Sequence, residues 1–147
     1  MLGGTLRVRH NAQGSCLCAG IRFEITGKHS KVVICHCSRC RKTSGGGSAA
    51  QVVVKYDGLS WLSGEDLVVN GPKHAFCRLC GAHAPDANPR KTVYIVPAGI
   101  LDDNPSLVVG EHIFVGSKAH WEVLGADGAP RFDAGSLGPP IALDQQA

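Results

Sequence analysis

The stretch VICHCSRCRKTSGGGS, residues 33–48, holds three cysteines within six positions: Cys35, Cys37 and Cys40. A disulfide joins two cysteines, and a closed structural zinc site takes four ligands. Three protein ligands are typical of catalytic zinc, where the fourth position stays open for water or substrate. The stretch therefore predicts a fold organised by metal ligands, with one site that has room for a substrate.

Two further cysteine motifs flank this stretch, so the chain has seven cysteines in three clusters. Cys16 and Cys18 form a C-x-C motif, and Cys77 and Cys80 belong to a C-x-x-C-G motif that ends at Gly81. Residues i and i+2 of a strand point to the same face, so we expect both sulfurs of the C-x-C motif to reach one ion. The C-x-x-C-G motif predicts a tight knuckle in which the glycine permits the turn.

Spacing alone leaves two ways of dividing the seven cysteines. In the first, the C-x-C and C-x-x-C-G motifs form a closed structural site, and the triple motif holds a second zinc with an open position. In the second, Cys37 and Cys40 pair with Cys77 and Cys80 as a zinc ribbon. The gap of 36 residues between these two pairs is longer than the usual ribbon spacing, and three cysteines are left without a role. Spacing therefore favours the division of four plus three.

Length and composition narrow the classes of function. A chain of 147 residues is sized for one domain, and a formal net charge of +3 is too mild for a general nucleic-acid binder. The first residues lack the apolar segment of a signal peptide, and no apolar run is long enough to span a membrane. We therefore expect a cytoplasmic protein without a nucleic-acid or membrane partner, in which reduced thiols bind metal. The oligomeric state is not indicated.

Short strand patterns dominate the chain. Residues 21–25 (IRFEI) alternate apolar and polar side chains. Valine-rich runs bounded by Gly, Pro, Asn or Asp follow at residues 31–34, 49–56, 66–70, 92–99 and 106–115. A short helix is expected at residues 38–43, stopped by the glycines at 45–47, and a helical turn at residues 117–124. This pattern predicts a mainly β domain of short antiparallel sheets with one or two short helical turns.

Four segments occur in an order that resembles a known family: GSCLCAGIRFEI, CHCSRCRKTSG, FCRLCGAH, and VPAGILDDNPSL followed by EHIFVGSKAHWEVL. They are similar to the glutathione-dependent formaldehyde-activating enzyme family, which also includes centromere protein V. The resemblance covers residues 14–124 and implies a zinc-binding β-tent fold. We therefore expect an N-terminal extension at residues 1–13, the zinc-binding domain at 14–124, and a loosely attached Gly/Pro-rich tail at 125–147.

The resemblance also implies roles for the cysteines. It assigns a structural zinc to Cys16, Cys18, Cys77 and Cys80, and an open, catalytic zinc to Cys35, Cys37 and Cys40. The implied activity is the formation or lysis of a carbon–sulfur bond, joining formaldehyde to glutathione as S-hydroxymethylglutathione. One departure follows the last cysteine motif, where residues 84–95 read APDANPRKTVYI, a more Pro-rich and polar segment than expected. If this segment lines the pocket, the substrate would differ.

Three cations lie beside the triple motif: Arg39, Arg41 and Lys42. Guanidinium and ammonium groups bind carboxylates, so these residues are candidate contacts for the carboxylates of glutathione. The alternative is a solvated turn whose cations offset the thiolate charge. An open zinc would also favour the thiolate form of a bound small thiol at neutral pH.

The histidines near the cysteines are not expected to be metal ligands. His36 lies between two ligand cysteines and should point to the opposite face, where it packs or supports a ligand. His74 and His83 flank the C-x-x-C-G motif and are expected to make local hydrogen bonds. Two functions remain: a zinc-dependent carbon–sulfur lyase-type enzyme acting on a small thiol adduct, or a zinc-stabilised β module that binds a protein or nucleic-acid partner. The open metal position favours the enzyme.

Overall fold

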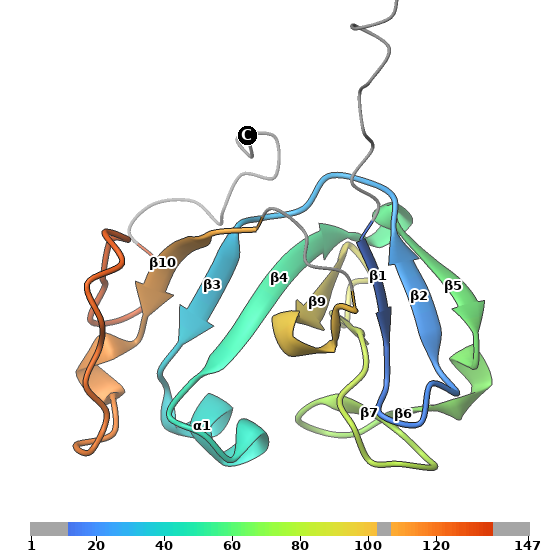
Figure 1. The fold of residues 1–147 in the computed structure, drawn as a ribbon, viewed down its shortest axis with the longest axis horizontal. Coiled ribbons are helices and arrows are strands. Elements are labelled where there is room, and N and C mark those ends of the chain that lie inside the picture. Colours follow the sequence, from blue (N-terminus) through green and yellow to red (C-terminus); the bar gives the residue numbers. More distant parts are fainter. Residues whose placement is uncertain (1–11, 103–106, 137–147) are drawn as a thin grey trace, which may run out of the picture.

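The computed structural model of this chain describes residues 12–102 and 107–136 (Figure 1). The expected N-terminal extension, apart from its last two residues, lies outside the described residues. So does the part of the C-terminal tail from residue 137 onward.

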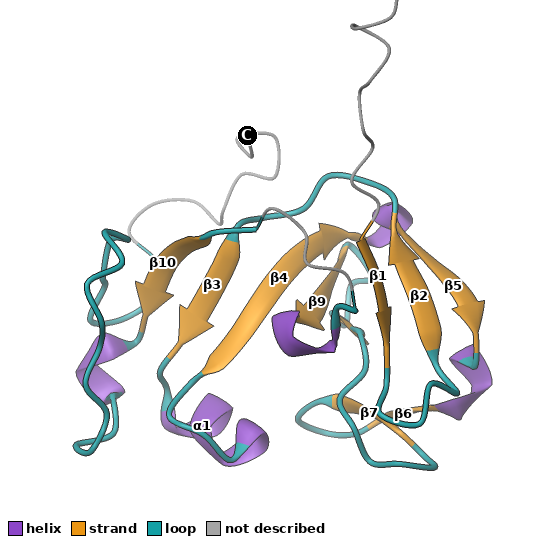
Figure 2. Cartoon of the chain, in the orientation of Figure 1, coloured by secondary structure: helices purple, strands orange, loops and turns teal. Residues whose placement is uncertain are grey.

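Strands make up most of the described chain (Figure 2). A three-stranded sheet has the order β1 (Ala12–Ser15), β2 (Arg22–Ile25), β5 (Leu59–Ser63). A five-stranded sheet has the order β10 (Val109–Ile113), β3 (Val32–Cys35), β4 (Ala49–Lys55), β9 (Val93–Pro97), β8 (Asp86–Ala87). Strands β6 (Val68–Asn70) and β7 (Ala75–Cys77) form a hairpin, and α1 spans Ser38–Ser44. Within the described residues, no helix has the length and apolar character needed to cross a bilayer.

The two larger sheets lean toward each other at one end of the molecule and separate toward the other end (Figure 1). Helix α1 and the β6–β7 hairpin lie at the open end. Strand β3 runs into the loop before α1, and β1 ends beside the hairpin. The fold therefore gathers all three cysteine motifs at its open end.

The core fills the space between the two sheets. Alternation along β4 buries Val52 and Val54 completely, and β9 places Val96 and Tyr94 opposite them. Phe23, from β2, closes this cluster from the other sheet. Burial of one such side chain contributes about 1.5–3 kcal/mol to stability. A second, smaller core surrounds the four-cysteine cluster.

The expectation of a mainly β fold with short sheets and one short helix is confirmed. Helix α1 ends where the glycines begin, because Gly45 adopts a left-handed φ of 75° and its N–H donates to the carbonyl of Arg41. One pairing differs from the expected antiparallel arrangement, since β10 runs parallel to β3. Strands β1, β5, β7 and β8 have no counterpart among the expected strands, because they contain no valine or isoleucine.

Residues 130–134, within the expected tail, pair with the backbone of β10 and of Phe114. The Phe132 N–H donates to the carbonyl of His112, and the N–H of His112 donates to Pro130, each at 2.9 Å. The Phe114 N–H donates to the carbonyl of Ala134 at 2.8 Å. These bonds satisfy the free edge of β10, which would otherwise present unpaired backbone groups to solvent.

Candidate metal centre and adjoining cavity

The first metal-ligand cluster consists of Cys16, Cys18, Cys77 and Cys80, whose sulfurs lie within 4.8 Å of one another. The Sγ atoms of Cys16 and Cys18 are 3.6 Å apart, and those of Cys18 and Cys77 are 3.9 Å apart. Four sulfurs bound to zinc at about 2.3 Å in tetrahedral geometry lie about 3.8 Å from one another. The spacing of this cluster therefore fits a four-coordinate zinc ion.

Two tight turns position these four cysteines. Cys16 and Cys18 do not lie on a strand as expected; they follow β1 in a turn closed by a 2.9 Å bond from the Ala19 N–H to the Cys16 carbonyl. The turn brings both sulfurs to the same cluster, with Cys16 buried and Cys18 exposed. The expected knuckle is present after β7, where Gly81 has a φ of 77° and its N–H bonds to the Cys77 carbonyl.

The second cluster consists of Cys35, Cys37 and Cys40, whose sulfurs also lie within 4.8 Å of one another. Cys35 ends β3 and is buried, whereas Cys37 and Cys40 are half-buried. Cys37 caps the N-terminus of α1, because its sulfur accepts a 3.3 Å hydrogen bond from the Cys40 N–H. The strand end, the cap and the first helical turn thus bring three sulfurs together, and Cys37 and Cys40 group with Cys35 rather than with Cys77 and Cys80.

The three sulfurs of this second cluster form a site suited to a cation. A hydrogen bond from the Cys40 thiol lowers the pKa of Cys35 to about 6, and the same bond together with burial raises the pKa of Cys40. Ionising one sulfur therefore opposes ionisation of its neighbour. A divalent cation would remove this conflict, because it stabilises all of its thiolate ligands together.

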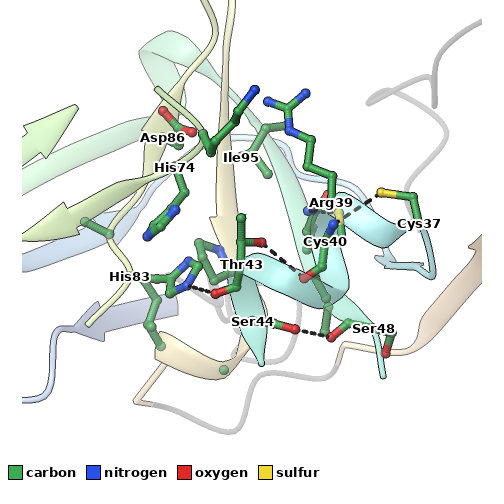
Figure 3. A pocket seen from close by; sticks show the side chains of 18 of the residues that line it. Cys37, Arg39, Cys40, Thr43, Ser44, Ser48, His74, His83, Asp86 and Ile95 are labelled. Atoms are coloured by element: carbon green, nitrogen blue, oxygen red, sulfur yellow. Dashed lines mark hydrogen bonds between the residues drawn. The ribbon is translucent and has the colours of Figure 1, made fainter. Parts of the chain in front are cut away.

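A cavity of about 660 Å³ adjoins the three-cysteine cluster, and Cys37 and Cys40 form part of its wall (Figure 3). This volume falls within the range of about 300–1,000 Å³ typical of small-molecule sites. Apolar residues of β4, β9 and the turn after β9 line much of the cavity. Its charged and titratable wall residues, apart from the cysteines, are Arg39, Lys73, His74, His83 and Asp86.

The three cations expected near the substrate occupy different places. Arg39 lines the cavity. Arg41 lies away from it, with Nη2 donating to the Ser117 carbonyl at 3.4 Å, and Lys42 is exposed and does not line it. Lys73, which the sequence analysis did not select, supplies a second cation to the wall.

The cavity also contains three titratable groups whose convergence the sequence analysis did not predict: His74, His83 and Asp86. The two imidazole rings are stacked, with centroids 4.3 Å apart and an interplanar angle of 18°. Burial lowers the pKa of His74 and raises the pKa of Asp86. The sequence did offer one signal for Asp86, because it belongs to the unusual segment at residues 84–95, and that segment does contribute to the wall.

His36 is fully buried and faces away from the cavity wall, as expected from its place between two cysteines. Its Nε2 lies 2.9 Å from Nδ1 of His112, and Nε2 of His112 lies 2.6 Å from Oδ2 of Asp127. Glu122 approaches the other ring nitrogen of His36 at 3.8 Å. A chain of polar groups therefore ties the loop of the three-cysteine cluster to β10 and to the segment that follows it.

Comparisons with known proteins identify the family. A family model described as glutathione-dependent formaldehyde-activating enzyme matches residues 11–117, more than half of the chain. A Halomonas elongata protein named after the same enzyme is 28% identical over 129 residues, covering 74% of this chain and 78% of the relative. A crystal structure of a Rhodobacter sphaeroides protein has a TM-score of 0.48 and 21% identity, over 61% of this chain and 87% of that one, which is too distant to argue from. From the family match, this chain belongs to the glutathione-dependent formaldehyde-activating enzyme family.

Proposed function

We propose that the chain is a zinc-dependent carbon–sulfur lyase or synthase acting on a small thiol adduct such as S-hydroxymethylglutathione. In this proposal Cys35, Cys37 and Cys40 hold the catalytic zinc, and the four-cysteine cluster holds a structural zinc. The observation that carries it is the cavity of about 660 Å³ with two of the three clustered sulfurs in its wall. A purely structural site would have no need of such a space.

A zinc ion bound by these three thiolates would supply a Lewis acid that favours the thiolate form of a fourth, substrate sulfur. The residues of the chain would do the rest. Arg39 and Lys73 offer cations for the carboxylates of glutathione, and Asp86 offers an anion for its ammonium group. The apolar wall contributed by β4 and β9 excludes water from the reacting carbon.

The position of each cation relative to the cavity changes the proposed set of substrate contacts. The proposal keeps Arg39 and adds Lys73, because both line the cavity. Arg41 and Lys42 belong in this proposal to the outer approach to the site, where they attract an anionic thiol over a distance. The proposed catalytic domain is residues 14–124 with the following segment, to residue 136, packed beside it.

Cobalt substitution tests the proposed function directly. Cobalt(II) bound to thiolates absorbs visible light, and a new thiolate ligand changes that absorption. We expect glutathione to change the spectrum of the cobalt protein at lower concentrations than a thiol without carboxylates, such as 2-mercaptoethanol. Catalysis is then measured by exchange NMR with ¹³C-formaldehyde and glutathione, against the uncatalysed exchange.

The binding-module alternative makes the opposite prediction. It expects no spectral change with any small thiol and no acceleration of exchange above the uncatalysed rate. Either of these two results, obtained on cobalt or zinc protein with both clusters loaded, contradicts the proposed enzyme. A spectral response that does not distinguish glutathione from 2-mercaptoethanol would contradict only the choice of glutathione as substrate.

A further inference from the structure

The stacked histidine pair in the cavity wall belongs to neither metal-ligand cluster found among the described residues, and it borders the space where a substrate would lie. In Figure 3, His74, His83 and Asp86 lie on one side of the cavity, and Cys37 and Arg39 lie on the other. The two histidines come from the β6–β7 hairpin turn and from the segment after the Cys77–Cys80 knuckle. A substrate bound at the cysteines would therefore have titratable groups across from it.

The hydrogen bond of His83 fixes which of its nitrogens carries a proton. Its Nε2 lies 3.2 Å from the carbonyl oxygen of Thr43, which can only accept, so Nε2 is the donor (Figure 3). In the neutral ring, Nδ1 is then the free base. Within the described part of the chain, Nδ1 of His83 has no hydrogen-bond partner, and it is not among the buried unpaired atoms. The second nitrogen is thus available to exchange a proton with a ligand.

The neighbours of His83 are compatible with a change of charge on its ring. His74, stacked against it, has a pKa lowered by burial and by His83, and it therefore remains neutral near pH 7. Asp86 supplies a nearby negative charge that would stabilise an imidazolium. The other titratable or charged groups that share the cavity are Lys73 beside the hairpin, and Arg39, Cys37 and Cys40 at α1.

We propose that His83 is a catalytic proton carrier for the reaction proposed above, on which this inference rests. During lysis, Nδ1 of His83 accepts the hydroxyl proton of the S-hydroxymethyl thiol. The electron pair of that O–H bond forms the second bond of the aldehyde carbonyl, and the carbon–sulfur pair leaves with the sulfur as thiolate. The products are formaldehyde, thiolate and a protonated His83, so no oxidant or reductant is needed. In synthesis, the same ring returns the proton to the aldehyde oxygen.

Replacing His83 with glutamine separates proton transfer from structure. Glutamine can still donate from Nε2 to the Thr43 carbonyl, but it cannot exchange a proton at neutral pH. We expect His83→Gln to keep its metal content and its KM within about twofold while kcat falls about 10²- to 10⁴-fold, the usual range for a general acid–base residue. His120→Gln, the same change at an exposed histidine outside the cavity wall, should match the wild type.

The pH dependence supplies a readout that a structural role would not change. The rate of wild-type lysis should fall at low pH, because a protonated His83 cannot accept the substrate proton. His83→Gln should lack this decrease, and NMR of the His83 ring follows its protonation in the wild type. A wild-type rate that ignores the protonation of His83 overturns the inference without any variant. A His83→Gln enzyme with wild-type kcat also overturns the inference. So do His83→Gln and His74→Gln enzymes that lose equal activity and both keep the wild-type pH profile. Wild-type protein that does not accelerate exchange at all would instead refute the proposed function, and this inference with it.

Discussion

Replacing one cysteine in each cluster by serine should separate the two metal sites by their effect on stability. Cys77 is fully buried and packs with Ile21 and Ala75 in the smaller core. Binding of a structural zinc contributes about 10–16 kcal/mol of apparent free energy at pH 7, whereas a whole domain is stable by only about 5–15 kcal/mol. Because about 1 kcal/mol shifts the Tm of a domain of this size by about 3 °C, we expect Cys77→Ser to be unfolded or to melt at least about 10 °C lower.

Cys37→Ser should have a much smaller effect on stability. Cys37 is half-buried, and its sulfur caps α1 by accepting from the Cys40 N–H. Serine is a favoured residue at this helix position, and its hydroxyl can accept the same hydrogen bond. The cost is then limited to the loss of one metal ligand near the surface, so we expect a Tm within about 5 °C of the wild type.

Circular dichroism melting and elemental analysis of the same freshly reduced samples measure both effects. We expect two zinc ions in the wild type and one in Cys37→Ser. Equal losses of Tm in the two variants would refute the assignment of separate structural and catalytic sites. A wild-type protein that settles at one zinc, with three thiols titratable in the native state, would refute the presence of two metal sites.

Two further predictions concern charge. Arg39→Gln should weaken the spectral response of the cobalt protein to glutathione about tenfold or more and leave its response to 2-mercaptoethanol unchanged. Lys42→Gln, outside the cavity, should have a smaller effect. Equal effects of the two changes would remove Arg39 from the substrate contacts. The hydrogen bond from His112 lowers the pKa of Asp127 below its ordinary 3.8, so the stabilisation is complete above about pH 4 and is lost as the pH falls through the lower, folded-state pKa. At pH 6 the Asp127 carboxylate is charged, so Asp127→Asn should lower the urea midpoint there, and an unchanged midpoint would contradict this role.

The strands that could be predicted from the sequence are those with a strong local pattern. Strand β4 alternates its valines between core and surface, and this pattern appears in any window that contains it. Strand β1 reads AQGS and has no such pattern; it is a strand because residues 12–15 pair with residues 22–25 of β2. The parallel placement of β10 beside β3 is similarly a property of the assembled sheet, since the two strands are more than 70 residues apart.

The site shows the same division between local and long-range information. Cysteine spacing favoured the grouping of four and three, and the family resemblance implied it, because the cysteines within each motif are neighbours in sequence. Which motifs share a cluster is long-range information, since Cys18 and Cys77 are far apart in the chain. The convergence of His74, His83 and Asp86 was not predictable, because their positions depend on the hairpin, the knuckle and the pairing of β8 with β9. The sequence could not separate the three candidate cations either. Arg39 and Arg41 point to different sides of a short helix, and the position of the cavity, which Arg39 lines, depends on the tertiary fold.

The surroundings of the three-cysteine cluster include residues beyond the part of the chain that the family model matches. That match ends at Ser117, yet Glu122 and Asp127 reach the buried histidines behind the three-cysteine cluster. His36 lies between Cys35 and Cys37 and is fully buried. Its hydrogen bond to His112, which in turn contacts Asp127, fixes its ring behind the cluster. The geometry of the loop that carries Cys35, Cys37 and Cys40 therefore depends partly on the C-terminal segment. The backbone pairing of that segment with β10 holds Asp127 close to His112.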